Sequence, residues 1–200
     1  MKLKITLLLT MTWVLAGCIS LLPDAGPGPD IYRLSKITQT TSLQKPDTLI
    51  LLPLVQAPRE LKNNRVALVT GQQSISYAAN ARWASSTPEM LQVLFADALR
   101  NQSAIQVVYP EDGINADLEV RIILQNFEAV YDQGQKIPPI AKVQILVRII
   151  DRKTRTLAAE KVISSSARSS DVRLGSIVAA IDQASHNVAI DMSNWASSNK

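Results

Sequence analysis

The chain has 200 residues and a formal net charge of +4; 46% of its residues are hydrophobic and only 4% are aromatic. Its basic residues are interspersed with acids and form no lysine- or arginine-rich run, which excludes the electrostatic footprint of a nucleic-acid-binding protein. The single cysteine excludes a disulfide within the chain, and the length suits one domain whose stability comes from packing.

The first 17 residues have the pattern of a bacterial signal peptide. Lys2 and Lys4 precede an apolar stretch at residues 5–15, which is too short to span a bilayer core of about 20 apolar residues. The tetrapeptide Leu-Ala-Gly-Cys at Leu15–Cys18 resembles the lipobox of bacterial lipoproteins. This resemblance implies cleavage before Cys18 and acylation of its sulfur and amine, which gives stable membrane anchoring. The alternative is an ordinary secretory signal with an incidental cysteine.

Residues 18–30 are predicted to be the lipidated cysteine and a linker. The segment 19–30 holds three prolines and two glycines without periodicity, and it reaches at most roughly 35–40 Å. In enterobacterial-type sorting, an aspartate directly after the lipidated cysteine retains a lipoprotein in the inner membrane. Ile19 stands there instead, which points to the periplasmic face of the outer membrane.

The remaining residues, 31–200, are predicted to form one domain. Apolar patterns and turn signals indicate strands at 31–37, 48–56, 65–69, 73–77, 105–109, 117–131, 141–150 and 156–168, and helices at 87–101 and 171–195. Pro53 suggests that the second strand has an edge position or a bulge. Thr87 is expected to cap the first helix, and Ser170 or Asp171 the second.

The strands at 65–69 and 73–77 flank Thr70-Gly71, which is expected to be either the turn of a hairpin or a connection between strands. The strands at 117–131 and 141–150 alternate apolar and polar residues, and the strand at 156–168 is polar and serine-rich. Together the three are expected to form an antiparallel meander with one face on the core. These elements predict an α+β fold: an antiparallel or mixed sheet with two main helices packed on one face.

Residues suited to catalysis or metal binding are few. His186 is the only histidine, and Asp182 four residues earlier does not by itself make a metal site, so His186 is interpreted as an exposed or half-buried helical residue. The carboxylates of Glu111 and Asp112 precede a glycine, as in an ordinary turn, and no glycine-rich phosphate loop occurs. The sequence therefore predicts no metal, no cofactor and no enzyme, with a periplasmic hydrolase as the disfavoured alternative.

The stretch at 72–88 carries the candidate partner-binding residues Tyr77, Asn80, Arg82 and Trp83. Tryptophan and arginine are enriched in binding hot spots. The alternative is structural: Trp83 fills the core between sheet and helix, Tyr77 ends a strand, and Arg82 packs along Trp83 or pairs with an acid. The sequence leaves both interpretations open.

The order of these features resembles the ABC-type transport auxiliary lipoproteins, the PqiC-like family. The resemblance is carried by the lipobox, the proline-rich linker, the Tyr-x-Leu pattern of Tyr32 and Leu34, the apolar strand with prolines at Leu49–Pro58, and Tyr77 with Arg-Trp-Ala at Arg82–Ala84. It would cover nearly all of the mature chain.

This resemblance implies a non-catalytic subunit of an MCE-type lipid transport system, in which a periplasm-spanning MCE-domain protein moves hydrophobic molecules between membranes. The lipoprotein would dock the MCE component to the outer membrane. Because MCE assemblies are ring-shaped, a homo-oligomeric ring of this domain is a further expectation. A regulatory lipoprotein that activates a cell-wall synthase is the alternative, although such activators generally carry a longer linker.

Overall fold

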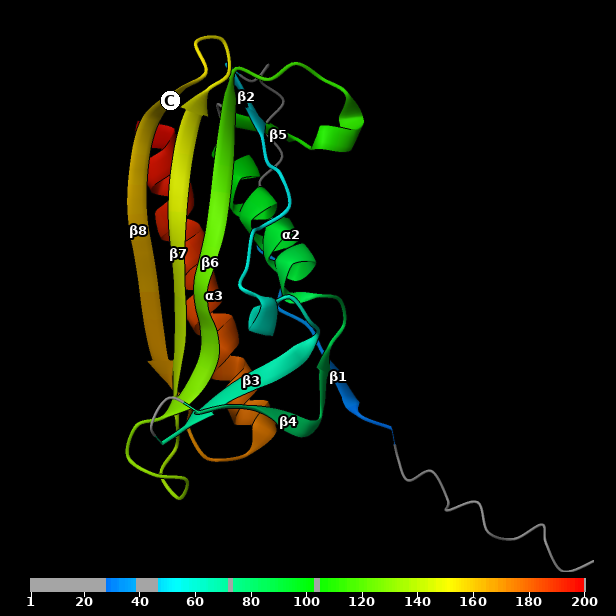
Figure 1. Ribbon diagram of the computed structural model, residues 1–200, viewed down its shortest axis with the longest axis vertical. Coiled ribbons are helices and arrows are strands. Elements are labelled where there is room, and N and C mark those ends of the chain that lie inside the picture. Colours follow the sequence, from blue (N-terminus) through cyan, green and yellow to red (C-terminus); the bar gives the residue numbers. More distant parts are fainter. Residues whose placement is uncertain (1–27, 39–46, 72–73, 103–104, 200) are drawn as a thin grey trace, which may run out of the picture.

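The structure is a computed structural model that describes residues 28–38, 47–71, 74–102 and 105–199. Within these residues, one eight-stranded mixed sheet is backed by two helices, α2 (Thr87–Arg100) and α3 (Leu174–Ser198). Figure 1 shows the longest strands running beside α3, with α2 next to it. The predicted α+β architecture is confirmed.

The sheet is organised around β6 (Leu118–Tyr131). On one side it pairs antiparallel with β7 (Ile140–Asp151), which pairs antiparallel with β8 (Thr156–Arg168). The apolar positions of β6 and β7 alternate with outward residues, so one face of the meander packs on the helices. The meander predicted from the period of two is confirmed.

Two short groups of strands share the other side of β6. Near its start, β2 (Thr48–Leu51) lies between β6 and β5 (Ile105–Val108), parallel to both. Near its end, β3 (Arg65–Thr70) pairs with it in parallel and continues to β4 (Ser74–Trp83) and β1 (Asp30–Tyr32). Two 3-10 turns, η2 (Arg59–Leu61) and η3 (Pro110–Asp112), complete the elements in the described ranges.

The predicted hairpin at Thr70-Gly71 is confirmed, and Gly71 adopts the left-handed backbone that such a turn favours, with φ of 32°. The predicted edge position of Pro53 is wrong, because β2 has a neighbour on both sides. Backbone pairing of the chain with the sheet instead stops after Leu52 and resumes at Gln56, which bridges Ile123. Pro53 lies in this bulge-like interruption, where its lack of a backbone N–H removes no hydrogen bond of the sheet.

α2 begins at Thr87 as predicted but is capped one residue earlier than expected, and α3 begins three residues later than predicted. The N-cap of α2 is Ser86, whose backbone N–H donates to the Glu89 carboxylate at 3.0 Å. Thr87 is not the cap because its hydroxyl donates to the carbonyl oxygen of Asn63 at 3.1 Å. α3 begins at Leu174 rather than near 171, because the Asp171 carboxylate holds a tight loop with Arg173 instead of capping.

The Asp171 loop gives a pH prediction. Hydrogen bonds from the Arg173 side chain and backbone, and one from Ser176, lower the pKa of Asp171 to about 2. Since the folded pKa lies below the unfolded value of about 3.9, these interactions stabilise the fold above about pH 4 and are lost as the pH falls through about 2. In Arg173→Gln we expect the NMR titration midpoint of the Asp171 carboxyl to rise toward 3.9. The midpoint of Asp132, which is lowered by Arg168, should stay unchanged; an unchanged Asp171 would contradict the assignment.

Candidate functional site

Trp83, the most prominent of the predicted partner-binding residues, lies in the core. Its side chain is only 1% exposed, and its ring centroid is 5.5 Å from that of Phe127 on β6. The indole Nε1 is buried and has no hydrogen-bond partner within the described part of the chain. In this fold the Trp83 side chain is not accessible to a partner, and it fills the core as the second interpretation of the sequence had it.

The other three candidates lie on the surface of β4. Tyr77 is half-buried; its hydroxyl donates to the carbonyl oxygen of Glu60 at 2.9 Å, and the guanidinium of Arg65 lies 4.0 Å from its ring centroid. Asn80 is exposed, and the half-buried Arg82 donates to the carbonyl of Ala81 at 2.8 Å. Arg82 therefore neither packs in the core nor forms an ion pair in the described structure.

These surface residues adjoin the point where the chain enters the domain. β1 pairs in parallel with the end of β4, with Ile31 opposite Arg82 and Tyr32 opposite Trp83. Ile31 is 64% exposed and, with Asn80 and Arg82, lines a corner of the sheet that we call the β1–β4 corner. In Figure 1 this corner lies at the opposite end of the molecule from the β7–β8 turn. Cys18 itself lies outside the described residues, so its lipidation stays a prediction.

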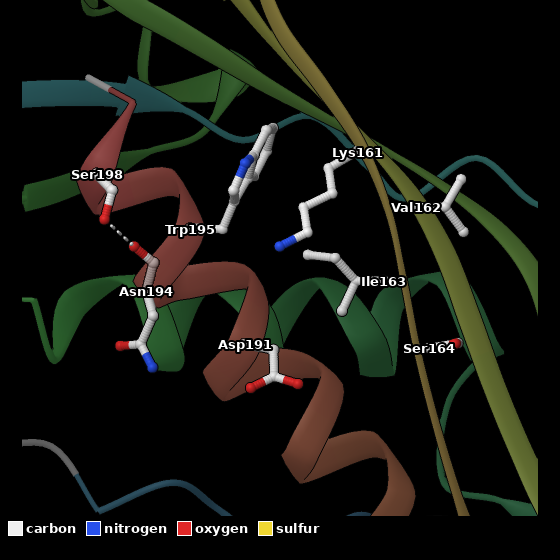
Figure 2. A pocket seen from close by; sticks show the side chains of 8 residues that line it. All are labelled: Lys161, Val162, Ile163, Ser164, Asp191, Asn194, Trp195 and Ser198. Atoms are coloured by element: carbon white, nitrogen blue, oxygen red, sulfur yellow. Dashed lines mark hydrogen bonds between the residues drawn. The ribbon is translucent and has the colours of Figure 1, made fainter.

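A groove runs between β8 and the last turns of α3. It has a volume of about 650 Å³, and Figure 2 shows Lys161, Asp191 and Trp195 facing it while Val162 points away. β8 has a single strand neighbour, β7, among the described residues, so its other edge offers backbone donors and acceptors. Sequence reasoning placed Trp195 on the apolar stripe of the helix and missed that it stays half-buried beside a free sheet edge.

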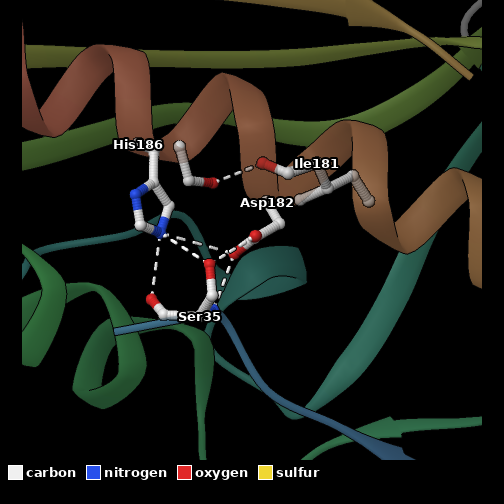
Figure 3. A network of polar contacts seen from close by, with 5 residues as sticks. Ser35, Ile181, Asp182 and His186 are labelled. Carbon is white, nitrogen blue, oxygen red and sulfur yellow. Dashed lines mark hydrogen bonds and ion pairs between the residues drawn. The ribbon is translucent and has the colours of Figure 1, made fainter. Parts of the chain in front are cut away.

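A polar cluster joins the N-terminal segment 33–38 to α3 (Figure 3). The Asp182 carboxylate accepts the backbone N–H of Ser35 at 2.8 Å and its hydroxyl at 2.6 Å. Nε2 of His186 lies 2.9 Å from the carbonyl oxygen of Ser35 and 3.0 Å from its Oγ. Three polar groups of one residue are thus held by two side chains one helical turn apart.

The cluster contains serine, histidine and aspartate but is not arranged as a catalytic triad. In a triad the carboxylate binds Nδ1 of the imidazole, and Nε2 accepts the serine proton. Here Asp182 binds Ser35 directly, and its Oδ1 lies 3.6 Å from Nε2 of His186. A carbonyl oxygen only accepts, so the contact with Ser35 O requires a proton on Nε2, which leaves this nitrogen unable to act as a base. We call this cluster of Ser35, Asp182 and His186 the clasp, because its hydrogen bonds hold segment 33–38 against α3.

The clasp predicts the effect of removing Asp182. In Asp182→Ala we expect amide hydrogen exchange at Ser35 to accelerate about tenfold or more, since hydrogen bonds to charged groups contribute about 1.5–3 kcal/mol. Residue-resolved exchange by NMR measures this. Asp191→Ala, on the same helix but away from Ser35, is the matched control and should leave the rate unchanged. Equal rates in wild type and Asp182→Ala would show that the clasp does not hold the segment.

Within the described ranges, no helix is long and apolar enough to cross a membrane. The same residues contain no group of three or more histidine, cysteine or acidic side chains placed to hold a metal ion.

Comparisons with known proteins identify relatives of this fold. The model of the family described as "ABC-type transport auxiliary lipoprotein component" matches residues 32–193. A crystal structure of a Xanthomonas campestris protein assigned to the family DUF330 has a TM-score of 0.72 at 18% identity, covering 84% of this chain and 94% of its own. An uncharacterized protein has a TM-score of 0.67 at 15% identity, covering 85% and 99%.

A hypothetical protein from Chlamydia trachomatis has a TM-score of 0.50 at 8% identity and covers 76% of this chain and 99% of its own. At these identities the structural likenesses show the fold alone. No curated protein matches the sequence.

Proposed function

Since this chain belongs to the family of ABC-type transport auxiliary lipoprotein components, we propose that it docks the periplasmic MCE component of a lipid transport system to the outer membrane. The observation that carries the proposal is the family match over residues 32–193, which takes in every strand and helix of the domain except part of β1 and the last turn of α3. The role is non-catalytic: the domain supplies binding surfaces and an anchor.

The anchor sets the geometry of docking. Acyl chains on Cys18 would hold the chain in the periplasmic leaflet, and the twelve residues 19–30 would let the domain stand up to roughly 35–40 Å away. β1 is the first strand of the described residues, so the β1–β4 corner stays nearest to the tether. We assign the MCE contact to the exposed side of β4, where Tyr77, Asn80 and Arg82 lie.

Self-association into a ring needs two different surfaces on each copy, because a closed ring is built from head-to-tail contacts. The domain offers such a pair. The free edge of β8 with its groove lies at one margin of the sheet, and on the other side of β6 lies the edge of β5 that pairs with no strand in the described part of the chain. A ring that uses both would present one face to the membrane and one to the MCE component.

The proposal is tested by crosslinking tagged protein in cells and identifying the recovered proteins by mass spectrometry. Wild type is expected to recover an MCE-domain protein, and Cys18→Ala should recover much less of it because the anchor no longer brings the two together. Recovery of a peptidoglycan synthase without any MCE-domain protein would contradict the transport role and favour the cell-wall regulator.

A further inference from the structure

Segment 33–38 lies beside both α2 and α3 and does not fill the space next to either helix. Leu34 is buried, but the segment leaves a hollow on each side. The hollow against α2 has a volume of about 170 Å³ and an apolar wall formed by Leu34, Met90, Val93 and Leu94. It is comparable with the roughly 150 Å³ apolar cavity that binds benzene in an engineered protein, so it can hold part of one hydrocarbon chain.

The hollow against α3 is larger, about 490 Å³, and Gly175, Val178 and Ala179 line it from the helix. Asp182 also lines it, but its carboxylate is engaged by Ser35 in the clasp. Small or apolar residues of a helix therefore line each hollow on one side, and segment 33–38 lines both hollows on the other side.

Two cations border both hollows. Arg33 and Lys36 line each of them, are exposed, and form no ion pair among the described residues. The one acid in the wall of the smaller hollow, Asp97, is 3.6 Å from Arg100 in an i,i+3 ion pair. An apolar hollow with unpaired cations at its mouth is complementary to an anion joined to a hydrocarbon chain.

We propose that the hollows beside segment 33–38 bind the acyl chains of an anionic lipid, with Arg33 and Lys36 contacting its headgroup. Position favours a lipid over a protein partner, because the segment begins only three residues after the predicted linker and so stays within reach of the leaflet that holds Cys18. This goes beyond docking, since the domain itself would receive lipid, and it stands whether or not an MCE-domain partner is recovered.

The test uses the full-length lipoprotein in its own membranes. The photo-reactive residue p-benzoylphenylalanine replaces Val93, which is 53% exposed at the smaller hollow. Val162, which is 52% exposed and points away from the groove beside β8, is the matched control. After irradiation, mass spectrometry of the protein identifies adducts, and the adduct mass distinguishes a free fatty acid from a phospholipid. Ala84, exposed on the rim of the same hollow, provides a second reporting position.

We expect lipid adducts at Val93 and Ala84 but not at Val162. In Arg33→Gln/Lys36→Gln the adduct yield should fall about fivefold, given the strength of exposed charge pairs. Lys153→Gln/Arg155→Gln removes two exposed cations from the β7–β8 turn and should leave the yield unchanged.

Three outcomes overturn the proposal. Equal lipid adducts at Val93 and Val162 would show only that the protein lies near a membrane. Protein adducts without lipid at Val93 would make the hollow a protein-docking surface. An unchanged yield of lipid adducts in Arg33→Gln/Lys36→Gln, with wild-type circular dichroism, would show that these two cations do not contact an anionic headgroup.

Discussion

Trp83→Ala is expected to lower the free energy of unfolding by about 3–5 kcal/mol, the usual cost of truncating a large aromatic side chain in a core. Trp83 is 1% exposed and packs on Phe127, so its removal leaves a cavity between β4 and β6. Urea unfolding followed by circular dichroism measures the change. Because the loss is a large part of the 5–15 kcal/mol that stabilises a typical domain, the variant should also be scarce in cells.

Two further variants separate the causes. Trp83→Phe keeps an aromatic ring and removes the buried Nε1 that lacks a partner, so we expect it to cost about 1 kcal/mol or less, well below alanine. Asn80→Ala, on the exposed face of the same strand, should stay within about 0.5 kcal/mol of wild type. A Trp83→Ala protein with unchanged stability and lost partner recovery would make Trp83 an interface residue after all.

Cys18→Ala is expected to release the protein from the membrane fraction almost completely. Each buried methylene contributes about 0.8 kcal/mol, so loss of two or more acyl chains removes far more binding energy than the exposed protein surface supplies. Immunoblotting of soluble and membrane fractions measures the distribution. Ile19→Ala is the matched control, since it changes a neighbouring residue and keeps the lipobox cysteine. A Cys18→Ala protein that stays in the membrane fraction would contradict anchoring through lipid.

The long regular elements of this fold could be predicted from the sequence because their burial repeats with a fixed period. β6 and β7 bury alternate residues, and Pro88 with Glu89 marks the first turn of α2. Segment 33–37 also has apolar residues, at Leu34 and Ile37, and was predicted as part of a strand. Only Asp30–Tyr32 pairs; Leu34 is buried without strand pairing, a tertiary contact that leaves no periodic signal.

The clasp could not be predicted for a related reason. Ser35 meets Asp182 and His186 across about 150 positions of sequence, and a lone serine in an apolar stretch carries no motif. Asp182 and His186 lie four residues apart on the predicted last helix, but that spacing gives no sign that both contact Ser35. Likewise, tryptophan is a residue type enriched in hot spots, and only the packing of Trp83 on Phe127 of β6 shows that its side chain lies in the interior.

Separation of inner and outer membranes on a density gradient tests the proposal that this lipoprotein docks an MCE component to the outer membrane. In wild-type cells, the MCE-domain partner is expected to sediment in part with the outer membrane. In Cys18→Ala cells, that share should fall to background while the partner remains in the inner membrane. An identical distribution of the partner in both strains would contradict the claim.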